Sequence, residues 1–231
     1  MFRDKEFLTT LVKIGVPISL QSLITSSLNL IDVMMIGQLG ETAVASVGLA
    51  NQIIFILQLF LFGGSTGASI FIAQYWGKKD IPGIRKVMGL CLVICGLIGS
   101  FFFVITAAFP HIALSMYSDD GQVIQLGSQY MRIVSLNCLI LSITTTYAAT
   151  LRSSGNVRLP VIISSIALGA NTLLNYCLIL GNFGLPALGV QGAAIATLTS
   201  RIIECLGLVA VTYIRKLPAA ARAVPPRQPL R

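Results

Sequence analysis

The feature that most limits this chain is a series of long intervals without charge. Residues 42–77, 87–118 and 159–200 contain no Asp, Glu, Lys or Arg. Residues 14–40 contain only Asp32, and residues 121–151 contain only Arg132. Because a helix of about 20 apolar residues crosses the hydrocarbon core of a bilayer, intervals of this length indicate a polytopic membrane protein.

The interval 159–200 is long enough for two helices and is interrupted by residues that break helices: Gly181, Gly184, Pro186 and Gly189. We therefore expect an all-α fold, a bundle of six transmembrane helices. The predicted helices lie near 14–36, 45–75, 87–109, 126–150, 159–180 and 190–214.

Basic residues outside these helices all lie on one side of the six-helix path. The other side contains Glu41, Asp119 and Asp120 and no Lys or Arg. Since loops rich in Lys and Arg remain in the cytoplasm, we expect a multi-pass protein of the plasma (inner) membrane with both termini cytoplasmic. The basic residues are Arg3, Lys5, Lys13, Lys78, Lys79, Arg85, Lys86, Arg152, Arg158, Arg215, Lys216, Arg222, Arg227 and Arg231.

Composition disfavours several other functions. The chain is 55% hydrophobic and 10% charged, whereas soluble domains contain about 25% charged residues. The net charge is +8, and the basic residues lie between the apolar runs, where they determine topology. No cluster of aromatic residues lies beside a basic patch, so we expect no nucleic-acid partner. No Walker A, HExxH or GxSxG motif is present, so we expect neither an enzyme nor a resident cofactor.

Polar residues at membrane depth are the candidate functional residues. Ser22, Ser26, Asn29 and Asp32 follow spacings of four, three and three, which place them on one stripe of a helix. Burial disfavours the charged form of a carboxylate, so Asp32 is suited to take up a proton or accept Na⁺. The alternative is an interfacial Asp32 whose carboxylate reaches water. We expect Ser22, Ser26, Asn29 and, on the next helix, Gln52 to line a cavity.

Two further helices bring polar side chains to the same depth. Asn171 and Asn175 lie one turn apart, and Thr197 lies on the following helix. At about 1.5 Å per residue, Asp32, Asn175 and Thr197 fall within roughly 5 Å of depth in the outer half of the bilayer. Taken singly, the Asn and Thr side chains suit hydrogen bonds between helices. Taken together with Asp32, they predict a site for a coupling ion, H⁺ or Na⁺.

One pair of charges lies within the last predicted helix. Arg201 and Glu204 are three residues apart and can pair along it. We expect a structural salt bridge, with gating or proton relay as the alternative. Arg132 is expected at the outer membrane interface.

Residues 1–216 are expected to form one membrane lobe. Residues 217–231 read LPAAARAVPPRQPLR and lack the preceding apolar pattern. We expect this tail to be disordered, or an artefact of truncation or of a change of reading frame.

Four stretches, in order, resemble the multidrug and toxic compound extrusion (MATE) transporters. They are LIDVMMIGQLGETAVASVGLANQ at 30–52, AQYWGKKD at 73–80, TLRSSGNVRLP at 150–160, and NTLLNYCLILGNFGLPALGVQGAAIATLTS at 171–200. The resemblance runs from about residue 7 to residue 214 and covers only the N-terminal lobe of that family's two six-helix lobes.

The resemblance implies export of drugs, organic cations or metabolites in exchange for H⁺ or Na⁺. It matches Asp32 to the family's coupling acid, and Asn171, Asn175 and Thr197 to the polar residues beside it. Some members have an acid where this chain has Asn175, which leaves the choice of H⁺ or Na⁺ open. The expected partners are the lipid bilayer, small molecules such as organic cations, and a missing second lobe or a second copy of the chain.

Two alternatives remain at this point. One is a truncated membrane fragment that does not transport, and the other is one lobe of a related flippase for lipid-linked oligosaccharides. The flippase would need a basic central cavity, and the predicted helix interiors contain only Arg132 and Arg201 as basic residues.

Overall fold

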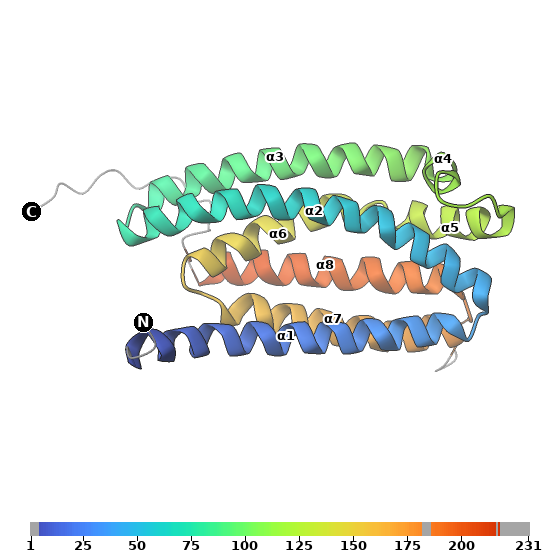
Figure 1. The fold of residues 1–231 in the computed structure, drawn as a ribbon, viewed down its shortest axis with the longest axis horizontal. Coiled ribbons are helices and arrows are strands. Elements are labelled where there is room, and N and C mark those ends of the chain that lie inside the picture. The colour runs from blue at the N-terminus through green and yellow to red at the C-terminus, as the bar shows by residue number, and fades with distance from the viewer. Residues whose placement is uncertain (1–4, 182–185, 216, 218–231) are drawn as a thin grey trace, which may run out of the picture.

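A computed structural model describes residues 5–181, 186–215 and 217. In the first helix it describes only some of the side chains, all of them at residue 15 or later. These residues form an elongated all-α bundle (Figure 1). Its helices are α1 (Lys5–Gly37), α2 (Glu41–Gly77), α3 (Ile81–Ala108), α4 (Pro110–Ser115), α5 (Gly121–Val134), α6 (Asn137–Ser153), α7 (Arg158–Leu180) and α8 (Val190–Ile214).

Several helices are long and apolar enough to cross a membrane. They are α2, α3, α7 and α8, with the bent pair α5 and α6 as a further candidate. Helix α1 has 33 residues, and its described apolar part is Ser26–Gly37. Large apolar side chains remain exposed on the outside, for example Leu97 on α3 and Leu173 on α7, as expected where lipid is the solvent. The chain is therefore an all-α, multi-pass membrane bundle.

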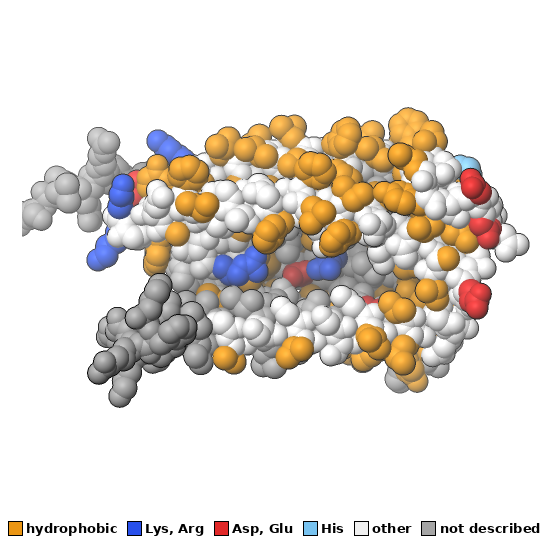
Figure 2. Space-filling model, viewed as in Figure 1, with side chains coloured by type: hydrophobic (Ala, Val, Ile, Leu, Met, Phe, Trp, Pro, Cys, Tyr) orange, Lys and Arg blue, Asp and Glu red, His pale blue; other side chains and the backbone are white. Residues whose placement is uncertain are grey.

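Charged side chains gather at the two ends of the bundle (Figure 2). Lys78 and Lys79 lie in the turn between α2 and α3, at the end that also holds the start of α1. Asp119 and Asp120 lie between α4 and α5, at the opposite end. The bundle thus has a basic and an acidic end, with an apolar band between them.

The fourth predicted helix, 126–150, is two helices in the structure. Helices α5 and α6 are bent by 50° at Ser135 and Leu136. The Ser135 hydroxyl donates to the Arg132 carbonyl at 2.7 Å. The Cys138 amide donates to the Ser135 carbonyl, three residues before it, and not to the carbonyl four residues before it as in a regular α-helix. Side chains that bond the backbone in this way bend helices without Pro or Gly, so hydropathy does not reveal the break.

Packing around α8 positions the site. Helix α7 packs along α8, α1 along α7, and α5 and α6 along the other side of α8. The approach of α7 to α8 requires Gly192, since a Cβ there would lie 2.5 Å from the Leu178 carbonyl oxygen. Helices α1 and α2 meet at the acidic end and diverge away from it (Figure 1). The space-filling view shows a hollow between them (Figure 2).

The predicted tail, 217–231, lies outside the described residues except for Leu217. The Leu217 amide donates to the Thr212 carbonyl at 3.0 Å, and its side chain packs against the cluster around Leu208.

Candidate cation and substrate site

The hollow between α1 and α2 contains charged side chains at mid-length of the bundle, where the surrounding surface is apolar (Figure 2). Helix α8 lies behind this hollow in the same view (Figure 1). Its charged residues are Arg201 and Glu204. Helix α1, which forms one wall, contains Asp32. The polar residues of the bundle thus form two clusters, one around Asp32 and one around Glu204.

Asp32 and Asn175 are hydrogen-bonded across α1 and α7. The Asn175 Nδ2 donates to Asp32 Oδ1 at 2.9 Å and to Asn171 Oδ1 at 3.3 Å. Asn171 and Asn175 are buried. Because an ionised carboxylate only accepts hydrogen bonds, the amide nitrogen must face Asp32. The structure thus joins three of the four residues predicted for ion coupling.

The same geometry leaves one oxygen without a partner. Asn175 Oδ1 is buried and accepts no hydrogen bond from the part of the chain that the structure describes. Buried polar atoms in proteins are almost always paired, so an unpaired one indicates strain, function or an absent ligand. Here the oxygen belongs to the amide that holds Asp32, which places a free acceptor beside a carboxylate.

Thr197, the fourth predicted residue, is connected to this cluster through Tyr130 on α5. The Thr197 side chain lies close to the Tyr130 hydroxyl, and Asp32 lies close enough to act on Tyr130 electrostatically. The Tyr130 hydroxyl also donates to Asn51 Oδ1 on α2 at 3.5 Å. Tyr130 is 3% exposed. The sequence interpretation missed Tyr130 and Asn51, although both are polar groups within long apolar runs.

These residues supply the oxygens that a proton or a hard cation requires. A carboxylate, amide oxygens and hydroxyls are hard ligands, which suit Na⁺ better than a transition metal. Within residues 5–181, 186–215 and 217, no three His, Cys, Asp or Glu side chains are close enough to hold a metal ion together. The arrangement of Asp32, Asn171 and Asn175 can therefore exchange a hydrogen bond for a small cation.

The residues predicted to line a cavity are exposed. Ser22, Ser26 and Asn29 lie on α1, and Gln52 lies on α2. These are the two helices that flank the hollow (Figure 1). Their role as cavity lining stays a prediction.

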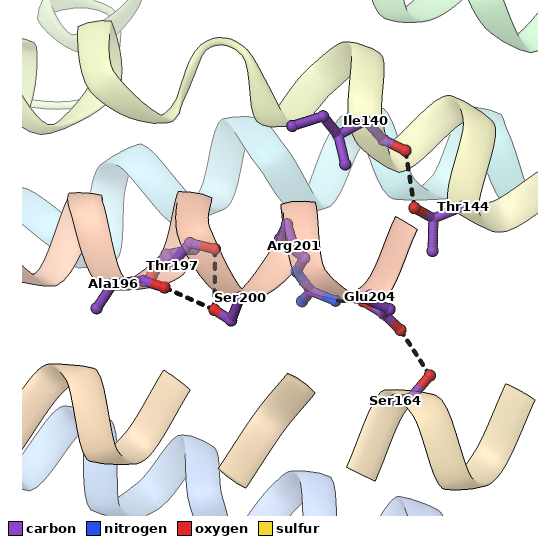
Figure 3. A network of polar contacts seen from close by, with 8 residues as sticks. All are labelled: Ile140, Thr144, Ser164, Ala196, Thr197, Ser200, Arg201 and Glu204. Carbon is purple, nitrogen blue, oxygen red and sulfur yellow. Dashed lines mark hydrogen bonds and ion pairs between the residues drawn. The ribbon is translucent and has the colours of Figure 1, made fainter. Parts of the chain in front are cut away.

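Arg201 and Glu204 form the pair that their spacing predicts, and a third residue joins them (Figure 3). Arg201 Nη1 and Glu204 Oε2 are 2.8 Å apart. The Ser164 hydroxyl on α7 donates to Glu204 Oε1 at 2.5 Å. Arg152, near the end of α6, also lies within electrostatic range of Glu204. The Ser164 contact joins residues far apart in the chain and was not predicted.

Arg132 is an exposed side chain in the last turn of α5. It lies three residues before the bend at Ser135 rather than at the end of the bundle. Its predicted place at the outer membrane interface is not tested by the described contacts.

Comparisons with known proteins agree with this fold. The family model MatE matches residues 17–177. A probable multidrug resistance protein NorM from Thermotoga maritima is 27% identical over 88% of this chain and 43% of its own length. A probable multidrug resistance protein YoeA from Bacillus subtilis is 32% identical over 87% of this chain and 43% of its own length.

Solved structures show the same arrangement of helices. The outward-facing conformation of a multidrug resistance MATE family transporter of the MOP superfamily superposes with a TM-score of 0.79 at 24% identity. The match covers 94% of this chain and 48% of that one. The chain therefore spans a little less than half the length of these relatives, the share expected of one lobe of a two-lobe transporter.

Proposed function

Because this chain belongs to the MatE family, we propose that it is the N-terminal lobe of an antiporter that exports drugs, organic cations or metabolites in exchange for H⁺ or Na⁺. The observation that supports this function is the bond from Asn175 to Asp32 at 2.9 Å, beside an amide oxygen that has no described partner. A carboxylate held by one neutral donor in a membrane is a natural place for a cation.

The proposed mechanism is mutually exclusive occupancy. A proton or Na⁺ that reaches Asp32 neutralises the carboxylate and competes with the Asn175 hydrogen bond. A cationic substrate in the hollow loses the attraction of that charge and is released. The coupling is a free-energy linkage between two ligands, so each weakens the binding of the other by the same factor.

The orientation follows from the two ends of the bundle. Lys and Arg gather at the end that holds the start of α1, and Asp119 and Asp120 lie at the other end. Positive-inside topology supports a plasma-membrane protein with the basic end and both termini in the cytoplasm. Asp32 lies near the end of α1 (Lys5–Gly37), so its cluster would be loaded from outside.

Transport requires a second lobe. Alternating access in two-lobe carriers comes from the movement of one lobe against the other around a central site. The partner of this lobe is a second six-helix lobe or a second copy of the chain. The hollow beside α1 and α2 is where we expect the partner lobe to complete the substrate cavity.

The test is ethidium efflux from liposomes that contain the purified chain, driven by an imposed H⁺ or Na⁺ gradient. We expect Asp32→Asn to lower driven efflux by about ten-fold or more, the usual size of a coupling factor. Asp119→Asn, an exposed carboxylate between α4 and α5, is the matched control and should keep most of the efflux.

Equal efflux from the wild-type chain and Asp32→Asn would show that Asp32 is not the coupling site. No efflux from an inserted and folded wild-type chain would overturn the idea that two copies of the chain form a working carrier. The efflux assay would then need the chain together with a second lobe.

A further inference from the structure

Two cysteines that the proposed antiport does not use form a pair on α3. Cys91 and Cys95 lie near the middle of this helix and one turn apart, so their side chains share a face. Their Sγ atoms are 3.8 Å apart, and the two residues are 4% and 0% exposed. The pair is therefore a dithiol inside the bundle, at mid-depth of a helix that is long and apolar enough to cross a membrane.

A chain of hydrogen bonds runs from this pair to α6. The Thr146 hydroxyl donates its one proton to the Ser142 carbonyl at 2.9 Å. In its contact with Cys91 at 3.7 Å, the Thr146 oxygen is therefore the acceptor and the Cys91 thiol is the donor. Because the Cys91 proton is used there, the Cys95 thiol donates to the Cys91 sulfur. Both groups are thus neutral thiols whose sulfur atoms face one another.

Glycine lines the side of the dithiol that faces α2. A Cβ on Gly64 would lie 3.5 Å from Cys95 Sγ, at ordinary van der Waals distance, so the missing side chain leaves room for a further atom beside that sulfur. Gly64 is half-buried, and Gly63 beside it is exposed. A lipid-soluble molecule therefore has an approach to the dithiol along the glycines of α2.

The distance between the sulfur atoms restricts the ligand. Two bonds to sulfur of about 2.3 Å span about 3.8 Å at a tetrahedral angle and about 4.6 Å in a straight line, so the pair suits a bent centre. Zn²⁺ needs four ligands, and within residues 5–181, 186–215 and 217 no three His, Cys, Asp or Glu side chains could hold a metal ion together. Metal ions also require charged thiolates, which are costly at membrane depth. The ligand should therefore be neutral and complete with two thiols.

We propose that Cys91 and Cys95 bind a trivalent arsenical with one organic substituent, R–As(OH)₂. Two S–H bonds and two As–O bonds break, two As–S bonds form, and each thiol proton leaves with a hydroxyl group as water. Arsenic stays trivalent, no electron is transferred and no charge is created, so the product suits an apolar site. The inference is independent of the antiport, because Asp32 takes no part in it.

The experiment uses phenylarsine oxide, which hydrates in water to the form R–As(OH)₂ with a phenyl group as R. The purified wild-type chain is incubated with an equimolar amount, and the adduct is measured by intact-protein mass spectrometry. We expect a single phenylarsenic group on each chain. Because both bonds form within one site, 2,3-dimercaptopropanol should remove it and 2-mercaptoethanol at the same thiol concentration should not.

Variants test whether both thiols are needed. Cys91→Ser and Cys95→Ser should each lower the affinity by about 100-fold or more, since the second bond of a chelate benefits from a high effective concentration. Serine keeps a hydroxyl group in the hydrogen-bond chain, which favours retention of the fold. The control variants Cys177→Ser and Cys205→Ser remove half-buried thiols on α7 and α8 and should bind as the wild type does. Asp32→Asn should also bind as the wild type does.

A thiol map of the wild-type chain gives the same information without a variant. After treatment the chain is unfolded, alkylated with iodoacetamide and digested, and Cys91 and Cys95 should be the protected cysteines. Absence of an adduct on the folded wild-type chain would overturn the inference, as would protection of Cys138, Cys177 or Cys205 in their place. Full affinity in a folded Cys91→Ser or Cys95→Ser would also overturn it. The assay involves no transport, so its failure is separate from that of the antiport.

Discussion

The two polar clusters each centre on one carboxylate, but they satisfy it differently. The outer cluster surrounds Asp32, toward the acidic end of the bundle, and the inner cluster surrounds Glu204. Asp32 accepts from one neutral amide, Asn175, whose own oxygen has no described partner. Glu204 accepts from a guanidinium and a hydroxyl, one on each oxygen. Both lie on helices within the bundle, so the contrast comes from their partners rather than from their position in the chain.

The difference indicates which cluster can change its occupant. A charge without a counter-charge is costly in a membrane, so a cation that arrives at the half-buried Asp32 lowers the free energy of its carboxylate. The charge of Glu204 is already compensated by Arg201, and a further cation would gain little there. The outer cluster therefore suits exchange, and the inner one suits a fixed orientation of Arg201.

The largest effect should come from breaking the inner pair. Arg201→Leu leaves the buried Glu204 without its guanidinium and should lower the free energy of unfolding by about 1–3 kcal/mol. Glu204→Leu should cost less, because the Arg201 side chain is 39% exposed and retains contact with water. Thermal unfolding of the purified protein, followed by circular dichroism, measures both variants.

The double variant Arg201→Leu/Glu204→Leu should be more stable than the sum of the two losses predicts, since neither charge is left alone. In contrast, Asp32→Asn should change the free energy of unfolding by less than about 1 kcal/mol. Strict additivity in the double variant would show that the two charges do not stabilise one another.

A second acid at the outer cluster should change ion dependence rather than stability. Asn175→Asp replaces the amide that now donates to Asp32 at 2.9 Å with a second carboxylate. Two close carboxylates share a proton, so the pH range over which driven efflux changes should extend to higher pH than in the wild type. The shift should be on the order of one pH unit. Efflux against pH in liposomes measures it, with Asn156→Asp, in the turn between α6 and α7, as the control; an unchanged profile would place Asn175 outside the ion site.

The smallest effect should come from Tyr130→Phe, which removes the hydroxyl that bonds Asn51 and lies close to Thr197. Loss of one buried hydrogen-bonding group should lower the free energy of unfolding by about 1 kcal/mol and reduce efflux less than Asp32→Asn does. The exposed Tyr117 provides the control variant Tyr117→Phe. A loss of efflux as large as that of Asp32→Asn would make Tyr130 a part of the ion site itself.

The sequence predicted those parts of the bundle that depend on local spacing. Charge-free intervals predicted the all-α membrane fold, and helical depth placed Asp32 and Asn175 at one level. The sequence did not predict contacts between residues far apart in the chain, such as Tyr130 with Asn51 and Ser164 with Glu204. Neither partner has a local pattern that indicates the other.

The bend between α5 and α6 was not predicted, for a different reason. It follows from hydrogen bonds of Ser135 with the backbone, and the sequence around it continues the same apolar run. Hydropathy reports whether a segment enters the membrane, whereas the path of the helix depends on which polar groups bond the backbone.

The most direct test of mutual exclusion is the equilibrium affinity of the purified chain for rhodamine 123 at increasing Na⁺ and, separately, at decreasing pH. We predict that the wild-type affinity falls by about ten-fold with at least one of the two ions, and that the affinity of Asp32→Asn does not respond to either. An unchanged wild-type affinity, or the same fall in Asp32→Asn, would contradict the assignment of Asp32 as the residue where cation and substrate exclude one another.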